Sequence, residues 1–293
     1  METTALIIFV LTYIGIALGE VPGLALDRTG IALLGAIAMV AAGVVGEREA
    51  ILSIDTPTIL LLYSLMVVSS QFRLGGFYTH VAGRLTALLD RPRMFMLAMM
   101  SVSAVFSALL ANDIVCLAFT PVLAVALLRN GLNPVPFLLG LAMASNIGSA
   151  ATIIGNPQNM LIGQVGHLHF GRFFLWCLVP SALSLAAAYG LLVRMYRGRW
   201  AAAPGQPPTV AGDDWPAYNA RQSFKGLAVT VALVALFFTP VPRELSAICG
   251  AGFLLCSRRM STRSLLGLVD WHLITLFCGL FIVIHGIEVT GLP

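Results

Sequence analysis

The chain has 293 residues, of which 58% are hydrophobic and only 10% are charged, and its mean hydropathy is +0.91. A soluble domain carries about 25% charged residues, so this composition excludes one and indicates that most of the surface faces lipid. The net charge of +4 does not indicate a nucleic-acid-binding protein, because the basic residues lie between apolar stretches of membrane-spanning length.

The apolar stretches predict an all-α integral membrane protein with spans in nearly every part of the chain. The first stretch has Glu2 and no basic residue before it, so we expect a retained span and no cleaved signal peptide. The five cysteines lie in apolar stretches without a CxxC pair, which predicts neither a metal site nor disulfides. The predicted spans are 4–21, 29–45, 56–72, 94–110, 113–128, 135–165, 172–195, 224–240, 244–257 and 270–286.

Lysine and arginine predict the orientation of these spans. With the N-terminus outside, 14 of the 17 basic residues fall on the inner side, and Arg48, Arg172 and Arg243 fall outside. We therefore expect a multi-pass protein of the cell inner (plasma) membrane. Residues 74–90 are too polar to span and predict an amphipathic helix on the inner face. Residues 197–223 are rich in proline, glycine and alanine and predict a cytoplasmic linker.

Two consecutive spans are separated by only Ala111, Asn112 and Asp113. Such a short polar turn suits a hairpin that enters the membrane and returns, because polar backbone at membrane depth must be buried in protein or face a water-filled cavity. We expect residues 94–128 to form this re-entrant hairpin. Two full spans would give the same charge distribution, so the hairpin rests on its polar tip alone.

The next span, 135–165, contains the sequence GNPQN from Gly155 to Asn159. Pro157 removes a hydrogen-bond donor and clashes with the preceding helical turn, so we expect an interrupted helix. An unwound segment leaves carbonyl groups that can coordinate a cation. The half-helix that follows it presents free N–H groups to an anion.

Both motifs place amide and small polar side chains in apolar surroundings, where an unpaired amide costs about 1–3 kcal/mol. Partners from other helices, water, an ion or a substrate would satisfy them. Each residue also has a structural alternative: a helix cap for Asp113, close packing for the small residues and a kink for Pro157. The predicted ion- or substrate-binding residues are Asn112, Asp113, Ser145, Asn146, Thr152, Gly155, Asn156, Pro157 and Asn159.

We expect no cofactor and no resident metal, with a bound sodium ion near Asn112, Asp113 and Asn156 as the one ion left open. Neither of two histidine-containing pairs is expected to bind metal. His167 and His169 suit an ordinary external loop, and His285 and Glu288 suit the outer interface of the membrane.

The chain also contains an internal repeat. The segment that begins at Asp55 aligns without gaps with the segment that begins at Asp270, and the same offset of 215 pairs Arg28 with Arg243. Arg28 falls inside and Arg243 outside, which predicts inverted repeats. We expect a first repeat at 1–196, the linker at 197–223 and an incomplete second repeat at 224–293. A complete chain would then have roughly 410 residues. A natural half-size protein that pairs with another subunit is the alternative.

At residues 111–113 (AND) and 145–159 (SNIGSAATIIGNPQN), the sequence resembles the ion transporter superfamily of arsenite permeases, NhaD-type antiporters, and citrate and divalent anion symporters. The resemblance covers the whole chain in order of elements. It implies a scaffold part and a moving transport part, often in a homodimer, with Asn112 and residues 155–159 lining the site. Dicarboxylate symporters carry Ser-Asn-Thr at the hairpin tip, so the tip here looks more like the arsenite and NhaD branches.

We therefore expect a secondary active transporter of a small anion, similar to arsenite, citrate or another carboxylate or oxyanion, coupled to a sodium or proton gradient. The expected partners are that anion or an inorganic ion, the lipid bilayer and a second copy of the chain, and no nucleic acid. One alternative is a sodium/proton antiporter of the NhaD type, and another is an inactive fragment or half-transporter. An enzyme is not expected, because the sequence contains no HExxH, GxSxG or clustered acids.

Overall fold

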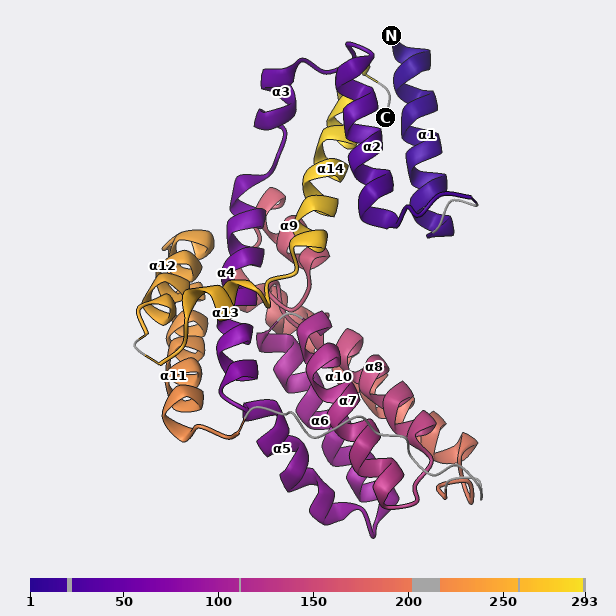
Figure 1. Ribbon diagram of the computed structural model, residues 1–293, viewed down its shortest axis with the longest axis vertical. Coiled ribbons are helices and arrows are strands. Elements are labelled where there is room, and N and C mark those ends of the chain that lie inside the picture. Colours follow the sequence, from indigo (N-terminus) through magenta and orange to yellow (C-terminus); the bar gives the residue numbers. More distant parts are fainter. Residues whose placement is uncertain (20–22, 111, 202–216, 258, 292–293) are drawn as a thin grey trace. The chain divides into compact units, whose positions relative to one another are not determined.

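The computed structural model describes residues 1–19, 23–110, 112–201, 217–257 and 259–291. Within these residues the regular elements are helices (Figure 1), and one isolated β-bridge pairs Leu132 with Ala201. The predicted all-α class of an integral membrane transporter is confirmed. Six of the described helices are long and apolar enough to cross a membrane: α4 (Thr56–Leu74), α6 (Pro92–Leu109), α7 (Asn112–Arg129), α10 (Phe170–Met195), α11 (Ala220–Phe237) and α14 (Trp271–Glu288).

The remaining helices are shorter. Helices α1, α2 and α8 are apolar but have fewer than 18 residues. The polar segment after α4 forms α5 and a short 3-10 turn. Helix α11 begins at Ala220, within the predicted linker at 197–223, and residues 202–216 of that linker lie outside the described part. The shorter elements are α1 (Glu2–Leu18), α2 (Arg28–Ala41), α3 (Glu47–Leu52), α5 (Phe77–Leu85), η1 (Thr86–Leu88), α8 (Pro134–Ser149), α9 (Pro157–Val165), α12 (Arg243–Leu255) and α13 (Thr262–Leu266).

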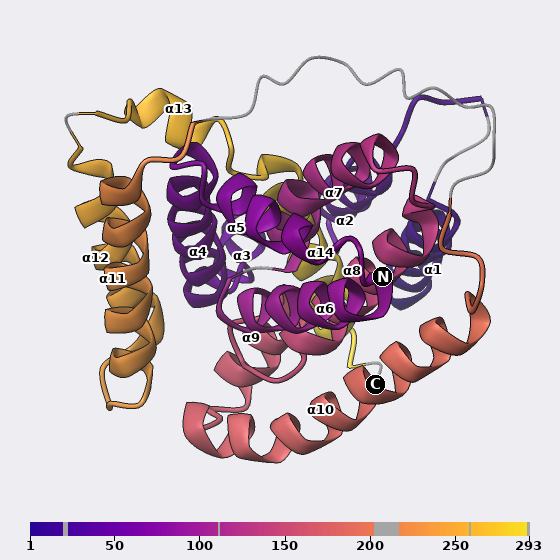
Figure 2. The ribbon, with the colours of Figure 1, turned by 90° about the horizontal axis from the view of Figure 1, so that it is seen from below.

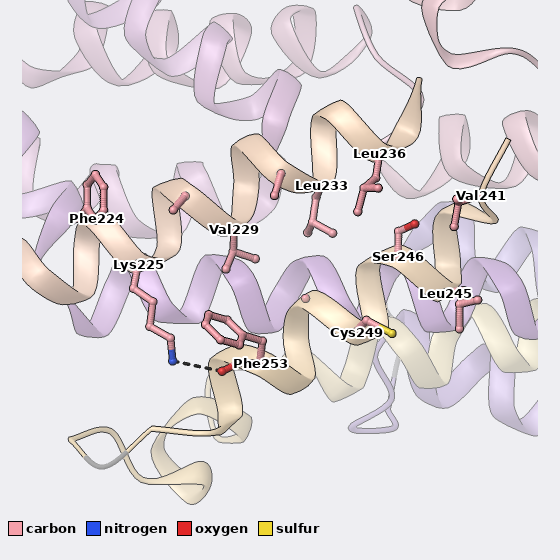
Figure 3. Close-up of a pocket in the computed structure, with 13 residues that line it drawn as sticks. Phe224, Lys225, Val229, Leu233, Leu236, Val241, Leu245, Ser246, Cys249 and Phe253 are labelled. Carbon is pink, nitrogen blue, oxygen red and sulfur yellow. Dashed lines mark hydrogen bonds between the residues drawn. The ribbon is translucent and has the colours of Figure 1, made fainter. Parts of the chain in front are cut away.

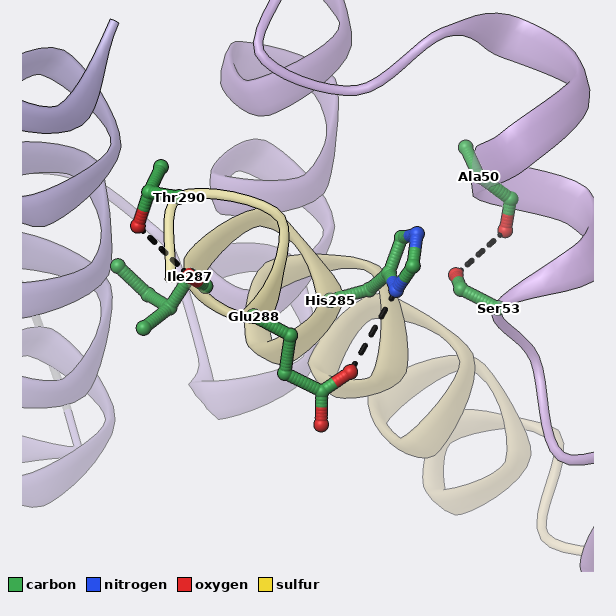
Figure 4. A network of polar contacts seen from close by, with 6 residues as sticks. All are labelled: Ala50, Ser53, His285, Ile287, Glu288 and Thr290. Atoms are coloured by element: carbon green, nitrogen blue, oxygen red, sulfur yellow. Dashed lines mark hydrogen bonds and ion pairs between the residues drawn. The ribbon is translucent and has the colours of Figure 1, made fainter. Parts of the chain in front are cut away.

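Residues Met1–Ile59 and Asp270–Pro293 form one compact unit. Helix α14 packs on α2. The two helices are so close that a side chain at Gly279 would collide with the backbone of Ala32. Buried apolar residues of α1, α2, α3 and α14 form its core around Met39. His285 and Glu288 lie one turn apart on α14, with 3.5 Å between imidazole Nδ1 and carboxylate (Figure 4).

Residues Leu60–Val269 form the second compact unit. Here α6 and α7 both pack against α8, and α10 packs against α8 and α6 (Figure 2). Helix α8 approaches α6 so closely that a side chain at Gly148 would collide with the backbone of Ala104. An aromatic cluster joins α5, α6 and α7, in which the Tyr78 ring lies 5.3 Å from that of Phe119 and 6.4 Å from that of Phe106. This packing holds the two motifs in place.

Three pairs of helices begin at residues that differ by the same 215 positions. They are α2 at Arg28 and α12 at Arg243, α3 at Glu47 and α13 at Thr262, and α4 at Thr56 and α14 at Trp271. The equal spacing agrees with the register of the predicted repeat, while its inverted orientation in a membrane stays a prediction. The third helix of each copy packs on the other copy's first helices: Gln71 of α4 donates to Gln222 of α11, and α14 packs on α1 and α2.

Candidate functional site

The tip of the α6–α7 hairpin meets the interruption between α8 and α9. The backbone N–H of Asn112, at the start of α7, donates to the carbonyl oxygen of Gly155 at 3.1 Å. The hydroxyl of Ser145 donates to the carbonyl of Asn112 at 2.9 Å, and the Asn112 amide lies 3.3 Å from the side-chain oxygen of Asn146. The two motifs that the sequence singled out therefore form one constellation. Ala111, also part of the first motif, lies outside the described residues.

The interruption itself consists of residues 150–156, between the end of α8 at Ser149 and the start of α9 at Pro157. Pro157 occupies the first position of α9, where its missing N–H costs nothing because no intrahelical partner exists there. Asn156 is the N-cap, and its side-chain oxygen accepts the backbone N–H of Asn159 at 2.8 Å. Proline thus begins the second half-helix, and the chain unwinds just before it.

Several of the predicted site residues hold this unwound segment together. The side-chain amide of Asn159 donates to the carbonyl of Thr152 at 3.0 Å, and that of Asn156 donates to the hydroxyl of Ser149 at 3.2 Å. The Thr152 hydroxyl donates to the carbonyl of Ala108 on α6 at 2.5 Å. Two of these bonds satisfy backbone carbonyl groups, and the third joins two side chains, so the shape of the interruption is built by its own side chains.

Position 155 requires glycine because the chain there lies very close to the backbone at the end of α8. A side chain there would collide with the backbone of Ser149, the last residue of α8. Because glycine has no side chain, the chain can fold back on the end of α8, and the Gly155 carbonyl points toward Asn112. The glycine therefore creates the junction between the two motifs.

The other polar side chains at this junction are exposed, or are buried without a hydrogen-bond donor among the described residues. The side-chain oxygen of Asn112 is buried and accepts no hydrogen bond from the described residues. Asp113 lies in the first turn of α7, not at its cap, and its side chain is exposed, as are those of Asn146 and Gln158. The starts of α7 and α9 both bring N–H groups and the positive ends of helix dipoles to this place. The junction thus combines the positive ends of two helix dipoles with side-chain oxygen atoms.

Sequence reasoning missed one structural partner of the site. The hydroxyl of Ser107, on α6, lies 2.7 Å from that of Ser145, on α8, and both residues are fully buried. This bond fixes the serine whose hydroxyl also reaches Asn112. Ser107 lies five positions before Asn112 in the chain, but its pairing with a residue 38 positions away depends on how α6 and α8 pack.

Two cavities in the described part of the chain have apolar walls. A groove of about 740 Å³ between α11 and α12 is lined mainly by aliphatic and aromatic residues (Figure 3). At one end, the Lys225 ammonium donates to the carbonyl of Phe253 at 3.1 Å. A second groove of about 390 Å³ lies between α6, α8 and α10 and contacts Thr152 from the apolar side. Neither groove offers the polar ligands found at the junction.

Comparison with known proteins agrees with this architecture. Residues 6–293 match the model of the citrate transporter family. The chain belongs to that family. This places it among transporters and excludes the enzyme alternative.

Relatives in and near the family include several transporters. Over 99% of its length and 69% of the relative's, the chain is 30% identical to an uncharacterized transporter of Mycobacterium tuberculosis. It is 40% identical to the silicon efflux transporter of Oryza sativa subsp. japonica, over 60% of this chain and 36% of that one. It is 33% identical to a protein of Dictyostelium discoideum that carries the name transporter arsB, over 59% of this chain and 31% of that one.

Proposed function

We propose that this citrate-transporter family member carries a small anion across the membrane and couples its movement to a sodium or proton gradient. The observation that carries the proposal is the bond between Asn112 and Gly155, which brings the starts of α7 and α9 together. Each start contributes the positive end of a helix dipole, which favours negative charge by about 0.3–1 kcal/mol per charge at an exposed terminus and by more when partly buried. Two such termini at one junction favour an anion over a neutral solute.

The coupling ion is proposed to bind beside the anion. The Asn112 side-chain oxygen is buried and accepts no hydrogen bond from the described residues, and the carboxylate of the next residue, Asp113, is exposed. Oxygen ligands of this kind suit a sodium ion, and a carboxylate also takes up a proton. Either cation would reduce the repulsion between the carboxylate and an incoming anion, which links the two binding events.

The chemistry of the junction favours small anions that need few contacts, such as arsenite, citrate or another carboxylate or oxyanion. The name of one relative, the silicon efflux transporter, points to a silicon compound as the solute of that protein. The Ala-Asn-Asp tip replaces the Ser and Thr hydroxyls of dicarboxylate symporters with a carboxylate. We therefore place oxyanions before dicarboxylates.

A sodium/proton antiporter is the second candidate, favoured by the exposed carboxylate of Asp113 at the start of α7. In that case the cations alone would exchange, and the helix starts would serve only to position Asp113. For either candidate we propose inverted repeats and an external N-terminus, supported by the common offset of the helix starts and by the charge distribution. We also propose a homodimer, which rests on the family resemblance alone.

The test is uptake into proteoliposomes that contain the purified full chain, with arsenite, citrate and silicate offered under an imposed sodium or pH gradient. We expect Asp113→Asn to abolish gradient-driven uptake while reconstitution yield is unchanged. Asp90→Asn is the matched control, because it removes the same charge from an exposed residue before α6. Uptake by Asp113→Asn at the wild-type rate would contradict the coupling role. Sodium-dependent proton movement without any anion would favour the antiporter.

A further inference from the structure

The far end of α9 is attached to the start of α12. The guanidinium Nη2 of Arg243 donates to the carbonyl of Gly163, in the last turn of α9, at 3.2 Å and to that of Leu168 at 3.0 Å. Carbonyls at a helix C-terminus lack intrahelical donors and carry the negative end of the dipole, so a cation there is doubly favourable. One arginine at the start of α12 therefore binds both the end of α9 and the corner between α9 and α10.

Gly163 makes this contact close. A side chain at Gly163 would lie against Arg243 Nη1 and against Ile153, which belongs to the interruption before α9. Arg243 Nη1 is itself buried and has no hydrogen-bond partner among the described residues, so Nη2 carries the bonds of the tie. The same glycine thus packs α9 against the arginine and against the unwound segment.

A second tie lies beside the first. The side-chain amide of Gln164 donates to the carboxylate of Glu244 at 3.1 Å. The rings of Phe170 and Phe238, whose centroids are 5.1 Å apart, close the same corner. A polar cavity of about 300 Å³ remains between the α9–α10 corner and the α11–α12 turn, which leaves room for the two to move.

Helix α9 has nine residues and is about 13 Å long, so its two ends cannot move independently. Its first residues, Asn156 and Pro157, belong to the junction with Asn112, and its last turn is tied to α12. We propose that Arg243 and Glu244 are positioning residues for transport, which hold α9 and thereby set the geometry of the ion site at its other end. This inference rests on the proposed function of that site.

The first measurement does not depend on any substrate. Hydrogen–deuterium exchange of the full chain in lipid nanodiscs reports how firmly residues 157–168 are held. We expect Arg243→Gln to accelerate exchange in this segment about tenfold, because it removes two charge-assisted bonds. Arg172→Gln is the matched control, since it removes the same charge from an exposed residue of the first turn of α10. Arg243→Lys keeps the positive charge but lacks the planar guanidinium with its several N–H donors, so it should protect residues 157–168 from exchange only in part.

The second measurement is anion uptake into proteoliposomes. Arg243→Gln should raise the concentration of anion needed for half-maximal uptake severalfold at equal protein content, and Arg172→Gln should not. Glu244→Gln should behave like the wild type because its amide oxygen can still accept from Gln164, whereas Glu244→Ala should speed exchange. Glu244→Ala also serves as the test if Arg243→Gln does not fold.

Exchange of residues 157–168 at the wild-type rate in both Arg243→Gln and Glu244→Ala would overturn the positioning role. Faster exchange with unchanged half-maximal uptake would also overturn it, since the tie would then be structural only. If the wild-type chain transports none of the anions offered, the proposed function fails, while the exchange measurement still decides whether α12 holds α9.

Discussion

The polar residues around the interruption between α8 and α9 combine structural and binding roles. Thr152, Asn156 and Asn159 were predicted as site residues, and each donates to a backbone or hydroxyl group of the protein itself. At the junction of the two motifs, the side-chain oxygen of Asn112 is buried without a hydrogen-bond donor among the described residues, and the side chain of Asp113 is exposed. Substitution at the first group should therefore reduce stability, and substitution at the second should reduce transport.

Thr152 allows the structural role to be measured. Thr152→Val keeps the shape but leaves the carbonyl of Ala108 without its donor, which should lower the free energy of unfolding by about 1–3 kcal/mol. Thr152→Ser keeps the hydroxyl and should lose less. Thermal unfolding in detergent micelles measures the difference. Equal midpoints for the valine and serine variants would show that the hydroxyl contributes nothing.

At the scale of elements, the position of the hairpin depends on the contact between α6 and α8. Gly148 permits that contact, because its missing side chain leaves space for the backbone at Ala104. The contact places Ser107 of α6 beside Ser145 of α8, whose hydroxyl holds the start of α7. The site is thus assembled by one close helix pair, and the sequence shows only that small residues are frequent there.

Gly148→Ala should therefore destabilise the protein by about 1–3 kcal/mol or more, because the added methyl group would collide with the backbone of Ala104, which cannot change rotamer as a side chain can. Gly190→Ala on α10 is the control: nothing lies within 4 Å of the added atom, and alanine favours helix over glycine by about 0.5–1 kcal/mol. Unfolding midpoints of the two variants should shift in opposite directions. A shift of the same sign and size in both would contradict close packing of α6 on α8.

At the scale of the whole molecule, the charge distribution predicts which loops face which side. The segment between α7 and α8 falls on the inner side, and the corner between α9 and α10 falls outside. This assignment does not depend on whether the hairpin is re-entrant. It places the two ends of the interrupted helix on opposite sides of the membrane, as the predicted span at 135–165 requires.

Single cysteines in a background without the five native ones test this topology. A membrane-impermeant thiol reagent added to intact cells should label His167→Cys and should not label Asn130→Cys, and both residues are exposed in the structure. Permeabilised cells should label both, which controls for reactivity. Labelling of Asn130→Cys from outside would reverse the predicted orientation.

The sequence alone determined the class of the protein, the approximate spans and the two motifs, because these depend on local properties. Hydropathy over some 20 residues reports burial in lipid, and the Gly155 and Pro157 pair reports a break in a helix. It also predicted the register of the repeat, which the starts of three helix pairs match. It predicted an interrupted helix at 135–165, and the structure has α8 and α9 there, with proline at the start of the second helix.

Only the tertiary structure decided which residues meet. The bond from Asn112 to Gly155, the pairing of Ser107 with Ser145 and the tie from Arg243 to α9 each join residues more than 30 positions apart. Such pairs depend on how whole helices pack, and packing depends on side-chain volumes summed along each interface. No local pattern contains that sum, which is why the sequence could name the members of the site but not its bonds.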